Sequence, residues 1–120
     1  MKYAYLIIYF GIIFSQDVPD SFNYIPTNLS GVFQGQITIN GSPASGSDWV
    51  AAFDGDGNCA GASELVFDGG TSYINLPIYG DDGTTSEIDE GINSGEQFYL
   101  KLWDSSSDLI LEYPDGFDCW

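Results

Sequence analysis

The chain has 120 residues, the length of one domain, with 18 acidic residues against two basic residues, no histidine and a formal net charge of −16. Nucleic-acid-binding proteins gain most of their affinity by neutralising phosphates with Lys and Arg, so this charge excludes nucleic acid as a partner. The lack of histidine removes Ser-His-Asp and Cys-His catalysis and imidazole metal ligands, and we predict that the protein is not an enzyme. Hydrophobic residues still make up 43% of the chain, enough to build a core.

The first 15 residues have the pattern of a secretory signal peptide. Lys2 supplies a positive charge, residues 3–14 form an uncharged apolar run, and Ser15 precedes a polar stretch. The run of about 12 residues is shorter than the roughly 20 that a membrane-spanning helix needs. We therefore expect export, no membrane insertion after cleavage, and a secreted, extracellular or cell-surface location. A buried N-terminal strand and an uncleaved anchor are the alternatives.

Residues 16–30 are expected to form an irregular lead-in, because Pro19 and Pro26 interrupt them, with one short edge strand near residues 22–25. Short apolar segments, some with the period-two alternation that fits strands and no helix, recur between turns through residues 31–120. The predicted strands there cover residues 32–40, 49–54, 59–67, 72–79, 98–104 and 109–113. Pro77 cannot donate a ladder hydrogen bond, so we expect the strand 72–79 at a sheet edge.

This spacing of short strands and Gly-rich turns predicts one all-β domain, a sandwich or barrel, over residues 31–120. The inward faces of the strands predict its core. The predicted core residues are Phe33, Ile37, Ile39, Val50, Ala52, Ile74, Leu76, Ile78, Leu100, Leu102, Leu109 and Leu111. In the strand 49–54, Trp49, Ala51 and Phe53 remain an alternative inward set.

Three blocks of sequence carry a resemblance to a known family. They read Gly-Ser-Asp-Trp-Val-Ala-Ala-Phe-Asp-Gly-Asp-Gly-Asn-Cys-Ala-Gly-Ala over residues 46–62, Leu-Pro-Ile-Tyr-Gly-Asp-Asp-Gly-Thr-Thr over 76–85, and Glu-Gln-Phe-Tyr-Leu-Lys-Leu-Trp-Asp over 96–104. Together they resemble an immunoglobulin-like module of large secreted bacterial surface proteins, often those with a C-terminal sorting domain for type IX secretion. The resemblance implies an immunoglobulin-like antiparallel β-sandwich of about seven strands and a non-catalytic spacer, adhesion or carbohydrate-associated role. No sorting domain follows Pro114, which leaves a fragment of a longer protein and a stand-alone module as alternatives.

Two groups of oxygen-bearing side chains are candidate calcium sites. Asp54, Asp56 and Asn58 stand at alternate positions of a Gly-rich turn, and Ca²⁺ takes 6 to 8 oxygen ligands. Cys59 stands where an EF-hand loop requires glycine, so the turn is no EF-hand. The alternative is a hairpin turn whose side chains bond their own backbone.

The second candidate calcium site is the long polar loop over residues 80–95, against the alternative of a solvated acidic loop. Its acidic residues are Asp81, Asp82, Glu87, Asp89 and Glu90. Asp104, at a strand end, is a further candidate ligand for either site.

Three aromatic residues, Trp49, Tyr79 and Trp103, are candidates for a sugar-stacking platform, against cross-strand or core packing. Export favours a disulfide between Cys59 and Cys119. Because Cys119 lies one residue from the chain end, where order is poor, we predict that the two cysteines are not bonded to each other.

These observations predict a secreted, non-catalytic β-sandwich module that acts as a structural or adhesive unit at the cell surface, with calcium as a stabilising ion. Its expected partners are extracellular or cell-surface proteins, or polysaccharide. One alternative is a carbohydrate-binding module. Another is a subunit of an extracellular filament, in which the lead-in over residues 17–30 pairs with the open sheet edge of a neighbouring subunit.

Overall fold

The computed structural model of the chain describes residues 18–80, 91–93 and 95–118. Strands make up its regular structure, apart from one turn of 3₁₀ helix, Asp20–Phe22. Within these residues, no helix is long and apolar enough to span a membrane. The predicted signal peptide, residues 1–15, lies outside the described residues.

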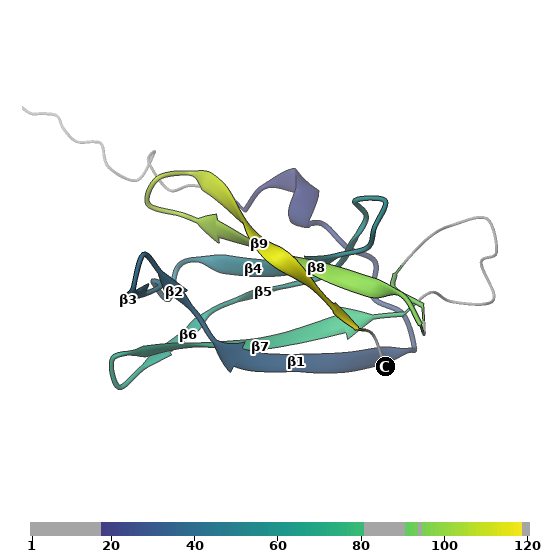
Figure 1. Ribbon diagram of the computed structural model, residues 1–120, viewed down its shortest axis with the longest axis horizontal. Coiled ribbons are helices and arrows are strands. Elements are labelled where there is room, and N and C mark those ends of the chain that lie inside the picture. The colour runs from purple at the N-terminus through teal and green to yellow at the C-terminus, as the bar shows by residue number, and fades with distance from the viewer. Residues whose placement is uncertain (1–17, 81–90, 94, 119–120) are drawn as a thin grey trace, which may run out of the picture.

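Two antiparallel sheets face each other in a sandwich-like arrangement (Figure 1). The smaller sheet has three strands in the order β1 (Ser30–Gln36), β7 (Thr71–Tyr79), β6 (Val66–Asp68). The larger sheet has four strands in the order β5 (Cys59–Glu64), β4 (Trp49–Phe53), β8 (Gln97–Asp104), β9 (Leu109–Asp118). A short hairpin pairs β2 (Thr38–Ile39) with β3 (Ser42–Pro43). The prediction of an all-β chain with antiparallel sheets is confirmed.

The core between the two sheets contains most of the predicted residues. Seven of them are buried there: Val50, Ala52, Ile74, Leu76, Ile78, Leu100 and Leu102. Phe33, Ile37 and Ile39 pack against this core and are partly buried. The alternation pattern missed five further members, which lie at strand ends or in loops or have small side chains: Ala44, Ala60, Leu65, Ile92 and Phe98.

Leu109 and Leu111 were predicted to be buried, and this prediction is wrong. Leu111 pairs with the inward-facing Leu102 across β8 and β9, yet its side chain is 38% exposed, and that of Leu109 is 55% exposed. The reason is that β9 is the edge strand of the larger sheet, and the smaller sheet ends at β1 before it covers this edge. Within the described part of the chain, an apolar strip therefore remains uncovered on this side.

Two predicted strands are divided in the structure. The strand 59–67 becomes β5 and β6, which belong to different sheets. The chain crosses between the sheets at Leu65, whose side chain is buried and whose N–H donates to the carbonyl of Asp48 (3.0 Å). The strand 32–40 likewise ends at Gln36, and its last residues pair in the β2–β3 hairpin.

The prediction that Pro77 marks an edge strand is wrong for β7 as a whole, because β7 lies between β1 and β6. The prediction holds locally at Pro77, because β6 pairs with β7 only as far as Tyr73 and leaves that side of Pro77 without a β6 partner. Gly80 donates to the carbonyl of Leu29 (2.7 Å), and Ile37 donates to that of Ser72 (3.1 Å). Hydrogen-bonded pairs alternate along an antiparallel ladder, so the pair Val32–Pro77 is a non-hydrogen-bonded one and costs the ladder no donor.

The lead-in covers the outer face of the larger sheet instead of forming an edge strand, so the predicted strand at 22–25 is wrong. Its 3₁₀ turn lies beyond β4 and β8, on the side away from β1 and β7 (Figure 1). Phe22 is 2% exposed and meets the ring of Phe53 edge-on at 5.8 Å. It belongs to the outer cluster, which consists of Phe22, Ala51, Phe53, Ala62 and Trp103. Packing Phe22 on this cluster removes more apolar surface from water than an exposed edge strand would.

The strand β4 is consequently buried on both faces, which resolves the two alternatives for its inward set. Val50 and Ala52 face the core between the sheets, whereas Ala51 and Phe53 lie in the outer cluster.

Asp48, just before β4, joins its own loop to the β8–β9 turn through a buried carboxylate that the sequence analysis did not single out. Its oxygens accept hydrogen bonds from the N–H of Ser45 and from the N–H and hydroxyl of Ser105, each at 2.9 Å. Together with the Leu65 bond, these contacts fix the end of the molecule where the chain changes sheets.

Candidate functional site

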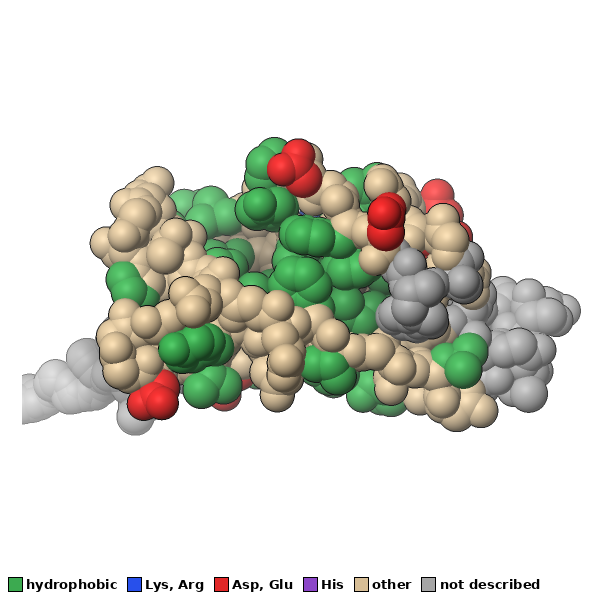
Figure 2. Space-filling view, turned by 60° about the horizontal axis from the view of Figure 1, so that its bottom comes forward, with side chains coloured by type: hydrophobic (Ala, Val, Ile, Leu, Met, Phe, Trp, Pro, Cys, Tyr) green, Lys and Arg blue, Asp and Glu red, His purple; other side chains and the backbone are tan. Residues whose placement is uncertain are grey.

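A groove of about 470 Å³ opens on the uncovered side of the sandwich, between β1 and β9. Figure 2 shows hydrophobic side chains gathered in a hollow that is bordered by backbone and polar residues. The floor is made by core side chains, among them Val50, Ile74 and Leu100, and one wall by Leu111 on β9. The groove therefore reaches down to side chains of the core between the two sheets.

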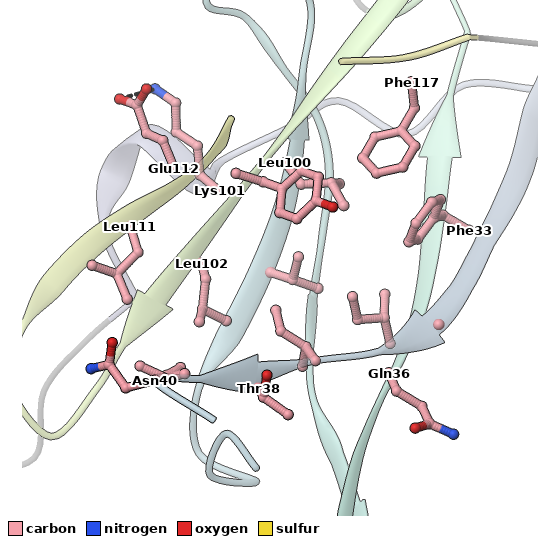
Figure 3. Close-up of a pocket in the computed structure, with 16 residues that line it drawn as sticks. Phe33, Gln36, Thr38, Asn40, Leu100, Lys101, Leu102, Leu111, Glu112 and Phe117 are labelled. Carbon is pink, nitrogen blue, oxygen red and sulfur yellow. Dashed lines mark ion pairs between the residues drawn. The ribbon is translucent and has the colours of Figure 1, made fainter. Parts of the chain in front are cut away.

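An aromatic cluster lies at one end of the groove, where Figure 3 shows Phe33 and Phe117 near each other. The ring of Phe117 lies 5.1 Å from that of Phe33 and stacks at 5.5 Å on that of Phe98. Tyr113 also stacks on Phe117, at 5.6 Å. These contacts join β1 to β9 at this end only, and the groove continues toward Ile39 and Leu111.

A glycine enlarges the groove on its β1 side. Gly35 occupies a position of β1 on the same face as Phe33, because successive residues of a strand point to opposite faces. A Cβ atom at Gly35 would lie 3.5 Å from the nearest atom, in the Phe33 ring, which is an ordinary contact. The groove therefore has room at this position for a side chain that the chain does not supply.

The rim of the groove on β9 is acidic. Glu112 lines the groove, and Asp115 and Asp118 follow it on the same strand with exposed side chains. Lys101 lies beside Glu112, with 4.0 Å between Nζ and Oε2, and its Nζ also lies 4.6 Å from the centre of the Phe53 ring. Lys2 and Lys101 are the only basic residues in the sequence, so little positive charge offsets this rim.

The predicted calcium turn lies elsewhere, between β4 and β5, where Asp54 organises the hairpin. One carboxylate oxygen accepts the N–H groups of Asp56 (2.9 Å) and Asn58 (2.8 Å), and the other accepts the Asn58 side-chain amide (3.1 Å). This geometry is that of the alternative in which the turn residues bond one another. Among the described residues, no three His, Cys, Asp or Glu side chains come close enough to share a metal ion.

The other predicted metal ligands are the acidic residues of the loop and Asp104. Asp81, Asp82, Glu87, Asp89 and Glu90 lie outside the described residues. Asp104 follows Trp103, which pairs with Trp49 at the opposite end of β4 from Asp54, about 16 Å along the strand. A hydrogen bond from the Ser106 hydroxyl (2.8 Å) and one from Ser107 (3.0 Å) lower the pKa of Asp104. Asp104 therefore cannot complete a site with Asp54.

The three predicted sugar-stacking residues are divided between two surfaces. Trp49 and Trp103 are cross-strand neighbours on the outer face of the larger sheet, and Trp103 is 2% exposed. The indole N–H of Trp103 donates to Asp108 (2.9 Å). Tyr79 belongs to the smaller sheet, where its ring stacks on that of Tyr24 at 5.6 Å. Sugar binding by these residues stays a prediction.

The position of Cys59 bears on the predicted absence of a disulfide. Cys59 lies on β5, at the opposite edge of the larger sheet from β9, and Cys119 lies outside the described residues. Three strand spacings, about 14 Å, separate β5 from β9. The Cα atoms of a disulfide lie within about 7 Å of each other. Cys59 therefore lies farther from the described residues of β9 than a disulfide spans, and the absence of a Cys59–Cys119 bond stays a prediction.

We expect Cys59 to react slowly with thiol reagents in the folded protein, because burial raises its pKa from 9.0 to about 11. At pH 8 this rise lowers the thiolate fraction about 100-fold, and the higher intrinsic nucleophilicity of a high-pKa thiolate offsets part of that loss. In a Cys119→Ser variant, labelling should be about tenfold slower in buffer than in urea. Equal rates would contradict the burial, and the unreduced, unfolded wild type should show two reactive thiols rather than none.

Comparison with known proteins gives no match to this chain among protein-family models, curated proteins or solved structures. Its function is therefore inferred from the chain and from the geometry of the groove.

Proposed function

We propose that the protein is a secreted, non-catalytic module with an immunoglobulin-like sandwich, acting as a structural or adhesive unit at the cell surface. The observation that supports this proposal most directly is the apolar strip on β9. Leu109, Leu111 and Tyr113 are exposed, and Leu111 and Tyr113 line the groove. A contiguous apolar surface of this kind is typical of a protein interaction site.

The charge of the chain agrees with such a role. The 18 acidic residues keep the protein soluble and repel anionic surfaces that it would otherwise bind without specificity.

We expect a variant with Leu109→Thr and Leu111→Thr to lose attachment to the cell surface. Threonine keeps β propensity while it removes apolar area, so β9 should still form. With the full chain expressed in its native host, the fraction retained on washed cells should fall about fivefold or more, measured by quantitative immunoblot. A fall of that size corresponds to roughly 1 kcal/mol of lost binding.

The matched control is Val66→Thr with Phe67→Thr, which removes apolar side chains of similar exposure from β6, away from the groove. This control should be retained like the wild type. Equal retention of all three proteins would contradict an adhesive role of the β9 strip, and retention of the protein inside the cell would contradict export.

Calcium stabilisation is a separate part of the proposal, and it is supported by the excess of acidic over basic residues. An ion that binds only the folded state stabilises it by about 2.7 kcal/mol at a hundredfold excess over Kd. For a domain of this size, roughly 4–8 °C in Tm accompanies each kcal/mol. Millimolar Ca²⁺ is therefore expected to raise Tm by about 10 °C or more. Sodium chloride at matched ionic strength is the control, and equal shifts would remove calcium from the proposal.

The alternative of a filament built by the lead-in meets a structural cost. Phe22 is buried in the outer cluster, and the Thr27 hydroxyl donates to the carbonyl of Gly80 (2.7 Å). A lead-in that paired with a neighbouring subunit would first have to leave these contacts.

A further inference from the structure

We infer that the groove accepts an extended segment of a second protein as an added β-strand along β1, with apolar side chains at alternate positions and Lys or Arg on its flanks. The inference rests on the proposed function, because it names the partner chemistry of the same apolar surface.

The hydrogen-bonding groups for such a strand are present on β1. Leu29 accepts a hydrogen bond from Gly80, just after β7, and Ile37 donates one to Ser72 of β7. The backbone N–H and C=O groups of the residues at odd positions between them therefore point toward β7, and those at even positions point away from it. Val32, Gln34 and Gln36 therefore direct their backbone N–H and C=O groups along the open edge. No strand within the described ranges pairs with this edge of β1. Added strands gain affinity from main-chain hydrogen bonds of this kind.

The groove also fits the side chains of a strand. Its long direction follows β1 and the residues after it, from Phe33 to Ile39. A strand beside β1 would place every second side chain over the floor of the groove, where Gly35 leaves room. The same strand would cover Leu111, which is on the inward face of its sheet and is 38% exposed. Because one ligand would have to cover both the floor of the groove and Leu111, we expect an extended peptide rather than a compact small molecule.

Charge selects the partner. The β9 rim carries Glu112, Asp115 and Asp118, and the whole chain has a formal net charge of −16. A second copy of the chain would bring an equally acidic surface to this rim, whereas basic residues flanking an apolar core segment would be attracted to it. The occupant is therefore a basic segment of another protein.

The test uses three fluorescein-labelled peptides and fluorescence anisotropy at low salt. The first peptide, Lys-Lys-Thr-Val-Thr-Val-Thr-Val-Thr-Lys-Lys, alternates apolar and polar residues. The second has the same composition with its three valines in succession, and the third replaces the lysines with glutamates. We expect binding of the first peptide to the full chain and about tenfold weaker binding of the other two.

Two protein variants locate the binding. Gly35→Leu fills the groove, and Val32→Pro removes a donor that faces the open edge without breaking a bond to β7. Each should weaken binding of the first peptide about tenfold. Gly46→Leu is the control, because a Cβ there meets the Cβ of Phe67 at the same 3.5 Å and Gly46 does not line the groove. It should bind like the wild type, and circular dichroism should show all three variants folded.

Several results would overturn the inference. Equal binding of the first and second peptides would show general apolar adhesion rather than an added strand. Dimers of the wild type that disappear in Gly35→Leu, measured by sedimentation, would identify a second copy as the occupant. Lack of any peptide binding to the wild type would also reject it, while the cell-retention experiment would still decide the proposed function separately.

Discussion

Gly61→Ala is expected to lower the free energy of unfolding by about 3 kcal/mol or more, the upper range for an overpacked site. Gly61 lies on β5, where the larger sheet approaches β7 of the smaller sheet. A Cβ atom there would lie 2.1 Å from the carbonyl oxygen of Pro77 and 3.2 Å from its carbonyl carbon. Both are backbone atoms, so no side-chain rotation can relieve the clash. The two sheets would have to separate along β5 and β7.

Urea denaturation of purified protein measures this effect, with Gly55→Ala as the matched control. Gly55 is exposed in the β4–β5 turn, and a Cβ there meets no atom within 4 Å. The control should change the free energy of unfolding by less than about 0.5 kcal/mol, as surface substitutions usually do. Similar stabilities of the two variants would contradict the close approach of β5 to β7.

The strands themselves could be predicted from the sequence, because alternation is a local signal. The predicted strand 72–79 differs from β7 by one residue, and 98–104 differs from β8 by one residue. The crossing at Leu65 could not be predicted, since it depends on which sheet each half of the strand joins. Val66 and Phe67 continue the apolar pattern of β5 although they pair with β7.

The groove could not be predicted from the sequence either, because it results from how the two sheets are placed relative to each other. Leu109 and Leu111 have the alternation of core residues, and their exposure follows only from the position of β9 beyond the edge of the smaller sheet. Gly35 was a local sign of a hollow, because it lies on the inward face of a strand and has no side chain to fill the space there. Inward-facing residues that remain exposed are the kind of departure from a sequence pattern that marks interaction sites.

Trp103 sits in the outer cluster, and Trp103→Ala is expected to lower the free energy of unfolding by about 3–5 kcal/mol, as for other buried aromatic residues. The side chain is 2% exposed and lies on the face of β8 that the lead-in covers. Its replacement removes the packing within the outer cluster and the hydrogen bond to Asp108. Trp103→Phe keeps most of the packing. The lost hydrogen bond should lower the free energy of unfolding by about 1 kcal/mol, in addition to the effect of the smaller buried apolar area.

A double-mutant cycle tests whether the lead-in is part of this cluster. Phe22 and Trp103 belong to the same cluster, and Phe22 reaches it from outside the sheet. If the lead-in packs on the sheet in solution, Phe22→Ala and Trp103→Ala should show a coupling energy above about 0.5 kcal/mol, because each leaves part of the same cavity. Phe22→Ala with Ile74→Val, which lies in the core between the sheets, is the control pair and should be additive. Additivity in both pairs would mean that the lead-in leaves the outer face free, and the outer cluster, with Trp49 and Trp103, would then be available to a ligand.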